Sequence, residues 1–387
     1  MAHFTQEHEM FRKTLRTFFE REVNPHIEEW EAAEIYPAHE VIKKLGALGA
    51  LGLTYSEEYG GMGADYFYTV ILAEEMGRID CGGVPMSIAV HTDMATPALA
   101  EHGSHELKKK YLEPAIKGEV VAAVAVTEPD AGSDVARITT RAIRDGDDYV
   151  INGRKLYITN GAQADWICLL ARTGDETGFR GMSLIIVPTD TPGFSVGRKL
   201  KKMGNHSSDT AELILDNVRV PISNRIGEEG MGFILQMQQF QKERLIAVFM
   251  SVAGMERAIQ RTIEYLRIRE TFGQPLIDNQ FIHFKLAELI TEVEILKQFG
   301  YRCAEMVMEG CDVTREASMA KYKVGKLVRE VADWCLQFHG GIGYMEETWV
   351  SRYFRDSRLI SIGGGADEIM LGIIAKYENI LPGKKKK

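Results

Sequence analysis

The spacing of hydrophobic residues changes twice along the chain. From residue 1 to about residue 120, apolar side chains recur every three or four positions with charged residues between them, as in EHEMFRKTLRTFFEREV at residues 7–23. This is the period of amphipathic helices, and Pro25 is expected to break or kink the first of them. Residues 1–120 are therefore predicted to form an N-terminal helical domain.

Between residues 121 and 226 the hydrophobic pattern shortens toward a period of two. Turn signals such as Asp145-Gly146 and Asn160-Gly161 bound short segments that are rich in β-formers. The predicted strands lie within EVVAAVAVTE (119–128), DYVINGRKLYITNG (148–161), ADWICLLAR (164–172), MSLIIVP (182–188) and AELILDNVRV (211–220). Short strands separated by tight turns predict a central antiparallel β domain.

From residue 227 to residue 387 the helical period returns. It persists through three long stretches, at residues 231–270, 278–310 and 314–341. Long antiparallel helices form bundles with sites between their elements, so this part is predicted to be a C-terminal four-helix bundle domain. The predicted fold class is therefore α+β and multidomain, in the order helical, β, helical.

Composition and charge exclude several classes of function. A formal net charge of −9 over 387 residues argues against nucleic acid as a partner, and the clusters Lys108–Lys110 and Lys384–Lys387 are expected on solvated surfaces. No apolar run is long enough to span a bilayer, and the N-terminus lacks the basic flank and apolar core of a secretory signal. The five cysteines form no CxxC pair, so no metal site is expected. These features predict a cytoplasmic protein.

Five stretches carry more information than periodicity alone. They are VAVTEPDAGSD (124–134), NGRKLYITNG (152–161), KKMGNHSSDTAELILDNVRVP (201–221), RETFGQPLIDNQ (269–280) and FHGGIGYMEE (338–347). Together, in this order and over nearly the whole chain, they resemble the acyl-CoA dehydrogenase family. The resemblance implies the acyl-CoA dehydrogenase fold, an FAD cofactor and an electron-transferring flavoprotein as electron acceptor. It also implies a homo-oligomer, usually a homotetramer built as a dimer of dimers.

The resemblance places FAD contacts in two groups of residues. The first group would line the flavin and consists of Val126, Thr127, Gly132, Ser133, Tyr157, Ile158 and Thr159. The second group would reach the FAD of a neighbouring subunit and consists of Arg269, Thr271, Phe272, Gln280, Gln337, Gly340 and Gly341. The donor fork of arginine suits pyrophosphate. Without the resemblance, the favoured readings would be an ordinary strand-to-loop turn for residues 124–134 and a surface salt bridge for Arg269, and residues 155–161 could simply pack across strands.

The stretch LISIGGGADEIM at residues 359–370 lacks the usual catalytic base. In most family members a glutamate occupies the position that aligns with Gly364. A glycine cannot act as a base, but the N–H of Gly364 is still expected to donate to the thioester oxygen. Gly365 is expected to contact the substrate, and Ala366 and Glu368 the cofactor, although the first-turn position of Glu368 favours a capping role.

The base is instead predicted to be Glu243, in FQKERLIAV at residues 240–248. A smaller branch of the family, including isovaleryl-CoA and long-chain enzymes, keeps its base on this long helix. Helical spacing gives independent support, because Phe240, Ile246, Ala247 and Met250 share the face of Glu243. A carboxylate on an apolar face is expected to have a raised pKa. The alternative is that Glu243 forms a structural ion pair.

The predicted reaction introduces a trans-2,3 double bond by α-proton abstraction and β-hydride transfer to flavin N5. Ser133, Phe240 and Arg244 are predicted substrate contacts, and the resemblance assigns Arg244 to the CoA phosphates. The three glycines leave room near the acyl β carbon, which would suit 3-methyl-branched chains. The resemblance to long-chain and to citronellyl-CoA dehydrogenases implies medium or long chains, or 3-methyl-branched chains of the citronellyl-CoA kind. Two alternatives stay open: an acyl-CoA oxidase, although oxidases are generally longer chains, and a non-catalytic acyl-CoA-binding homologue.

Overall fold

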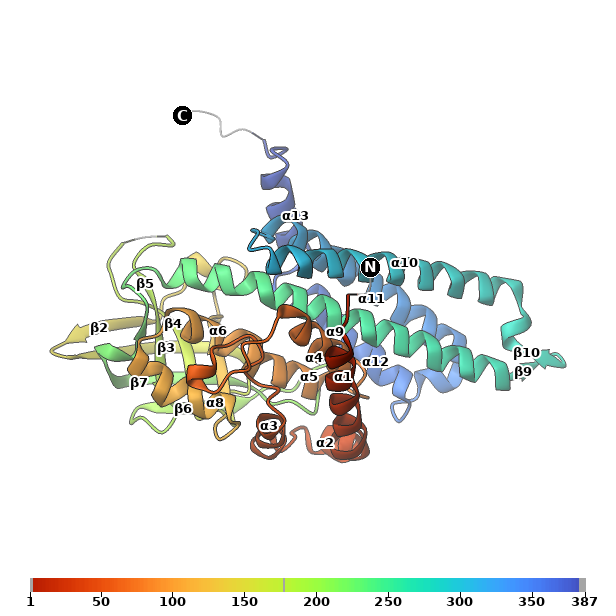
Figure 1. Ribbon diagram of the computed structural model, residues 1–387, viewed down its shortest axis with the longest axis horizontal. Coiled ribbons are helices and arrows are strands. Elements are labelled where there is room, and N and C mark those ends of the chain that lie inside the picture. Colours follow the sequence, from red (N-terminus) through yellow and green to blue (C-terminus); the bar gives the residue numbers. More distant parts are fainter. Residues whose placement is uncertain (1–2, 177, 383–387) are drawn as a thin grey trace.

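Helix α9 (Gly232–Ile268) runs through the molecule from a β-sheet at one end to a small hairpin at the other (Figure 1). The computed structural model describes residues 3–176 and 178–382, and the cluster Lys384–Lys387 lies outside the described residues. Helices precede the sheet in the sequence and follow it. The predicted order of helical, β and helical regions is confirmed.

The N-terminal region consists of short α-helices with 3-10 and π-helical segments between them. Its α-helices are α1 (Gln6–Phe18), α2 (Ile27–Ala33), α3 (Ala38–Ala47), α4 (Tyr66–Met76), α5 (Gly83–Ala89), α6 (Pro97–His102), α7 (His105–Leu107) and α8 (Glu113–Ile116). Its 3-10 and π segments are η1 (Phe19–Val23), η2 (Asn24–His26), η3 (Glu57–Tyr59), η4 (Val90–Ala95) and η5 (Lys108–Leu112). Pro25 lies in η2, between α1 and α2, where the sequence predicts the break.

The central sheet has the strand order β6-β7-β3-β2-β4-β5-β8, with β1 beside β4. The strands are β1 (Ala122–Ala125), β2 (Arg141–Asp145), β3 (Asp148–Thr159), β4 (Trp166–Arg172), β5 (Met182–Pro188), β6 (Phe194–Lys199), β7 (Thr210–Pro221) and β8 (Arg225–Ile226), with η6 (Val135–Arg137) and η7 (Ile222–Asn224) between strands. Most neighbours are antiparallel, as predicted. The exceptions are β1, which is parallel to β4, and one parallel pair between β2 and β4. Strand β1 enters from the helical region rather than through a hairpin, so no tight turn sets its direction.

The C-terminal region is built on three long helices. Its elements are α9, β9 (Glu270–Thr271), β10 (Gln274–Pro275), η8 (Leu276–Asp278), α10 (Gln280–Met308), α11 (Thr314–His339), η9 (Gly340–Tyr344), α12 (Trp349–Ser357), η10 (Arg358–Ser361) and α13 (Asp367–Tyr377). Apolar residues of α9, α10 and α11 share one core, and α13 projects from the body (Figure 1). Among the described residues, no helix is both long and apolar enough to cross a membrane.

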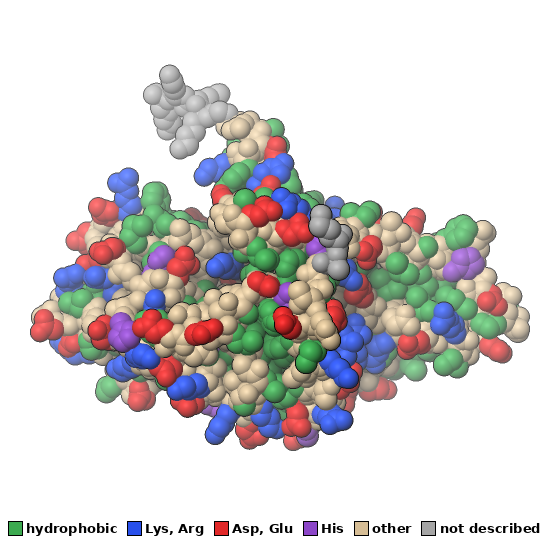
Figure 2. Space-filling view, viewed as in Figure 1, with side chains coloured by type: hydrophobic (Ala, Val, Ile, Leu, Met, Phe, Trp, Pro, Cys, Tyr) green, Lys and Arg blue, Asp and Glu red, His purple; other side chains and the backbone are tan. Residues whose placement is uncertain are grey.

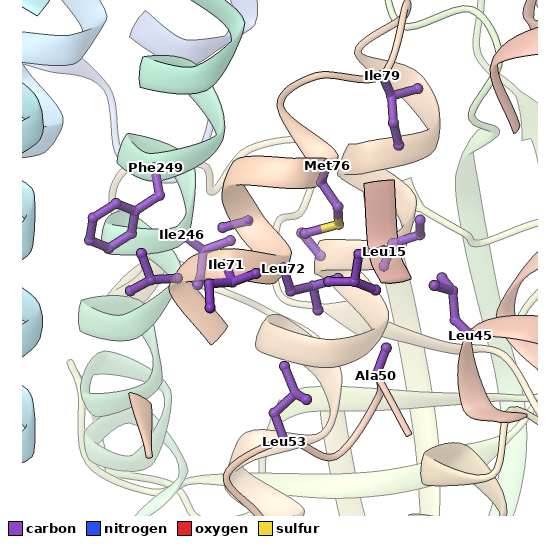
Figure 3. Packing of buried hydrophobic residues seen from close by; sticks show 14 of the residues in the cluster. Leu15, Leu45, Ala50, Leu53, Ile71, Leu72, Met76, Ile79, Ile246 and Phe249 are labelled. Atoms are coloured by element: carbon purple, nitrogen blue, oxygen red, sulfur yellow. The ribbon is translucent and has the colours of Figure 1, made fainter. Parts of the chain in front are cut away.

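A hydrophobic cluster joins the N-terminal region to α9. Figure 3 shows Ile246 and Phe249 of α9 beside Ile71 and Leu72 of α4, and all four side chains are buried. Burial of such side chains contributes about 1.5–3 kcal/mol each. This contact fixes the rotation of α9 about its axis and therefore the direction in which Glu243, three residues before Ile246, projects.

Candidate active site

Glu243 of α9 faces Gly364, which lies in the loop between η10 and α13. A Cβ atom on Gly364 would be 3.3 Å from Glu243 Oε1 and 3.6 Å from Lys321 Cε. Gly364 has a φ of +63°, a left-handed conformation that glycine adopts without steric cost. The carboxylate of Glu243 thus borders the space that a side chain at position 364 would occupy.

The carboxylate of Glu243 is buried but not paired. Glu243 is 6% exposed, and burial raises its pKa to about 7. The charge of Asp93 also raises this pKa, while Arg244 and Lys321 lower it. Within residues 3–176 and 178–382, this carboxylate accepts no hydrogen bond and has no ion-pair partner. A desolvated carboxylate with a pKa near neutrality has the properties of a general base.

Arg244 is the next residue and is equally deep, at 6% exposure. Its Nη1 lies 3.5 Å from Ser318 Oγ, its Nε has no hydrogen-bond partner among the described residues, and burial lowers its pKa. A buried guanidinium with an unused donor suits a polar group of a ligand. The assignment of Arg244 to the CoA phosphates stays a prediction. Of the other predicted substrate contacts, Phe240 lies one turn before Glu243 on α9 and Gly365 follows Gly364.

A buried ion pair fixes the loop that follows β1. Lys155 Nζ donates to Glu128 Oε1 and to the carbonyl oxygen of Val126, each at 2.9 Å, and Lys155 is 0% exposed. The side chain of Val126 is buried in the core. Gly132 and Ser133 are exposed further along the loop, and a Cβ on Gly132 would meet no atom within 4 Å. The loop therefore presents open backbone and the Ser133 hydroxyl to a ligand.

Tyr157 occupies a bulge in β3. The register of β3 against β7 shifts just before Ile158, and the Leu156 N–H donates to the Thr127 carbonyl at 2.8 Å. Tyr157 has a φ of +62° and is 65% exposed. Such strain costs about 1–3 kcal/mol and concentrates at functional sites. The bulge exposes the Tyr157 ring and half exposes Thr159, whereas the side chain of Ile158 is buried, so only its backbone is available to a ligand.

The second predicted group lies at the far end of α9. A cleft of about 890 Å³ brings together five of its members, Arg269, Thr271, Gln337, Gly340 and Gly341. Phe272 is fully exposed at the tip of the β9–β10 hairpin, and Gln280 is exposed at the start of α10. Helix α9 has 37 residues and is about 55 Å long at a rise of 1.5 Å per residue. The structure therefore separates the two predicted groups within one chain (Figure 1).

The two groups offer chemistry that fits the two halves of FAD. Tyr157 and the open loop backbone provide an aromatic face and approachable amides, which suit a flavin ring. The far cleft combines an arginine, hydrogen-bonding side chains and two bare glycines, which suit pyrophosphate and ribose. At the start of α13, Ala366 provides no side-chain cap and Glu368 is an exposed first-turn acid.

Three charged groups of this region, two buried and one half-buried, are absent from the predicted site residues. They are Asp93 on η4, Lys155 on β3 and Lys321 on α11, which is 1% exposed. The available signal was a charge inside an apolar stretch, as in AVHTDMATPAL (89–99) and ASMAKYKVG (317–325). Charged residues are almost never fully buried unless they are paired or functional.

The sequence matches all three domains described for acyl-CoA dehydrogenases: the N-terminal domain over residues 5–119, the middle domain over 123–218 and the C-terminal domain over 230–378. The mitochondrial long-chain specific acyl-CoA dehydrogenase of Sus scrofa is 38% identical over 376 residues, which cover 96% of this chain and 86% of that protein. The mitochondrial isovaleryl-CoA dehydrogenase of Solanum tuberosum is 34% identical over 374 residues, covering 96% and 90%. The crystal structure of an acyl-CoA dehydrogenase from Geobacillus kaustophilus has a TM-score of 0.94 at 40% identity and covers 98% of this chain and 99% of that one.

The domain matches follow the helical, β and helical order of the fold, and the relatives align over almost the whole chain. The fold, the enzyme class and the flavin cofactor implied by the five sequence stretches are confirmed. The chain belongs to the acyl-CoA dehydrogenase family of FAD-dependent oxidoreductases.

Proposed function

We propose that this enzyme oxidises an acyl-CoA thioester to the trans-2,3-enoyl-CoA, with Glu243 as the base. The observation that carries the proposal is the 3.3 Å between Glu243 Oε1 and the Cβ position of Gly364. Helix α9 thus brings the carboxylate of Glu243 to the loop at Gly364, which has no carboxylate of its own. The absence of a hydrogen bond to Glu243 within the described residues leaves this carboxylate free to accept a proton.

Two groups of the chain act on the thioester. Glu243 removes the proton at C2 in its ionised form, and a pKa of about 7 gives it basicity while a large fraction stays ionised at neutral pH. The N–H of Gly364 donates to the thioester oxygen, where negative charge develops as the proton leaves. FAD, held by the flavin-lining residues, would supply the two-electron acceptor for the hydride that leaves C3. Ser133, Phe240, Arg244 and Gly365 are the other proposed substrate contacts.

The enzyme is also proposed to work as a homo-oligomer. The cleft at the end of α9 is too far from the loop after β1 to bind the same FAD, so we assign it to the FAD of a second subunit. Ile268 is 82% exposed, Phe281 is 59% exposed and Phe272 is fully exposed. Figure 2 shows hydrophobic side chains on the surface of the C-terminal region toward β9 and β10. Exposed apolar surface of this kind marks protein interfaces. A tetramer and an electron-transferring flavoprotein as acceptor complete the proposal.

The proposed substrate has a medium or long acyl chain or a 3-methyl-branched one. Gly364 has no side chain in the space that borders the Glu243 carboxylate, which leaves room beside the reacting carbons. Relatives named for long-chain and for isovaleryl-CoA substrates are 38% and 34% identical to this chain. Flavin-bleaching rates with the two series of acyl-CoAs decide between straight and branched chains.

Anaerobic mixing of the flavin-loaded enzyme with straight and 3-methyl-branched acyl-CoAs is expected to bleach the flavin absorbance. A 2,2-dimethylacyl-CoA, which has no proton at C2, is expected to bind without bleaching. A colourless protein, or one that no acyl-CoA bleaches, contradicts the proposal and favours an acyl-CoA-binding homologue. Rapid reoxidation by air without an electron-transferring flavoprotein favours an oxidase.

The Asp93→Asn variant is expected to lower the pKa of Glu243. Asp93 is half-buried on η4, and its charge is one of the causes of the raised Glu243 pKa, whereas Arg244 and Lys321 act in the opposite direction. The pKa of Asp93 is about 6, so the effect requires a pH above that value. Removal of the negative charge should shift the acid limb of the pH profile of the flavin-bleaching rate to lower pH by roughly 0.5 unit.

The control for Asp93→Asn is Glu101→Gln, which removes an exposed acid from the neighbouring helix α6. Both variants change the net charge equally. Identical pH profiles for the two variants would show that Asp93 exerts no specific field on the base.

A further inference from the structure

Lys321 of α11 lies beneath the glycine loop that faces Glu243. It is 1% exposed, and its ammonium group donates to three backbone carbonyls, those of Ile360 at 2.5 Å, Gly363 at 3.1 Å and Gly365 at 3.3 Å. An ammonium has three N–H donors, so all of them are used on this loop. Within the described residues, Lys321 forms no ion pair with a carboxylate.

One of these carbonyls fixes the amide of Gly364 directly. The carbonyl of Gly363 and the N–H of Gly364 belong to the same peptide unit, which is planar and trans, so they point in opposite directions. Because Lys321 binds the carbonyl, the Gly364 N–H is directed away from α11. This N–H has no backbone partner among the described residues. The ammonium charge of Lys321 beside the Gly363 carbonyl also polarises this peptide and strengthens the Gly364 N–H as a donor.

Other contacts tie the same loop to the same face of α11. Ser361 Oγ donates to the carbonyl of Gly325 at 2.7 Å, one turn after Lys321. A Cβ on Gly325 would lie 2.3 Å from Asp367 Oδ1, so only glycine allows this close approach. Gly364 and Gly365 have φ values of +63° and +95°, in a region that glycine enters freely, so contacts from outside the loop are needed to hold it in one arrangement. Lys321 is the charged member of this support.

We propose that Lys321 is a positioning residue, which holds the Gly364 N–H toward the thioester oxygen and keeps a positive charge beside Glu243. The proposal rests on the proposed function, because it assigns Lys321 to the oxygen that becomes negative when Glu243 removes the C2 proton. It explains why a lysine is buried where an apolar residue would pack at no electrostatic cost.

The test compares Lys321→Met, Lys321→Gln and Lys323→Met in the flavin-loaded enzyme. Methionine preserves the stem and removes the donors, glutamine keeps an uncharged amide donor, and Lys323 is an exposed lysine of the same helix paired with Glu292. Lys321→Met is expected to lower kcat roughly 10- to 100-fold with KM changed little, as misplaced catalytic groups do. Lys321→Gln should recover part of kcat, and Lys323→Met should match wild type.

Two further readouts separate positioning from a merely structural role. The acid limb of the pH profile should move to higher pH in both Lys321 variants, because they lose a charge that lowers the pKa of Glu243, while Arg244 and Asp93 remain. Binding of a 3-oxoacyl-CoA enolate should weaken in Lys321→Met more than binding of the neutral 2,2-dimethylacyl-CoA. This second measurement requires no turnover, so it stands even if no acyl-CoA bleaches the wild-type flavin.

Several results would overturn the role assigned to Lys321. They are a wild-type kcat in either Lys321 variant, a change confined to KM, or an acid limb of the pH profile at the wild-type pH. Equal weakening of the binding of the enolate and of the 2,2-dimethylacyl-CoA would also count against it. If Lys321→Met does not accumulate with flavin, the same criteria apply to Lys321→Gln. Failure of both variants to fold while Lys323→Met folds would mark Lys321 as purely structural.

Discussion

The Glu243→Gln variant is expected to fold, bind flavin and bleach it with acyl-CoA roughly 10²- to 10⁴-fold more slowly than wild type. Glutamine has nearly the shape of glutamate, so the packing of α9 against α4 around Ile246 and Phe249 is preserved. Its amide cannot accept the C2 proton. Stopped-flow bleaching at saturating acyl-CoA measures the step directly, because it follows hydride arrival rather than product release.

A matched control for Glu243→Gln is Glu264→Gln, an exposed position on the same helix. It is expected to bleach like wild type. Should Glu243→Gln bleach at the wild-type rate, Glu243 is not the base. Binding of the 2,2-dimethylacyl-CoA should be similar in all three proteins, which separates loss of proton abstraction from loss of substrate affinity.

The Glu243→Gln variant is also expected to be more stable than wild type at alkaline pH. The folded-state pKa of Glu243, about 7, lies above its ordinary value of 4.5. Because the folded protein binds the Glu243 proton more tightly than the unfolded chain does, protonation of Glu243 favours folding. Wild type therefore has this stabilisation in full below pH 4.5 and loses it as the pH rises through about 7. Above that pH the variant should gain up to about 3 kcal/mol of unfolding free energy relative to wild type. A thermal-unfolding difference that vanishes toward pH 5 checks the sign.

The burial of Glu243 on an apolar helix face could be predicted because helical periodicity is local. Phe240, Ile246, Ala247 and Met250 flank Glu243 at helical spacing in the sequence alone, and in the structure Ile246 is buried while the other three are partly buried. The approach of Glu243 to Gly364 joins segments far apart in the sequence. Periodicity carries no information on that contact, and only the family resemblance placed the two residues together.

Other features of the site depend on the backbone and had no local signal. Tyr157 lies on a strand that alternates as predicted, but its positive φ arises from the register shift against β7. Lys321 meets three carbonyls of a distant loop, and its sequence context indicates only a charge on an apolar helix. Strands β2 and β6 were missed because most of their residues are exposed and polar, so hydrophobic alternation is weak.

A carboxylate moved to the loop should restore part of the activity that Glu243→Gln removes. The Cβ of a residue at position 364 would already lie 3.3 Å from the oxygen of Glu243, so a Gly364→Glu side chain in the Glu243→Gln background enters the same space. The cost is a left-handed φ of +63° for a residue with a Cβ, about 1–2 kcal/mol. We expect recovery of roughly 10-fold or more in the bleaching rate, short of wild type, as general-base catalysis by an imperfectly placed group allows.

The matched control for this relocated base is Gly364→Gln in the same Glu243→Gln background, which has the same size and the same backbone strain but no base. Recovery with glutamate and none with glutamine would assign the gain to proton abstraction. Equal rates in the two double variants, with flavin bound in both, would show that position 364 does not face the C2 proton. Gly364→Glu with Glu243 retained should bleach more slowly than wild type at pH 7, because two adjacent carboxylates raise the pKa of one of them. Gly364→Glu would then raise the bleaching rate when residue 243 is glutamine and lower it when residue 243 is glutamate. This pair of results is expected if the site has room for a single carboxylate, which either α9 or the loop can supply.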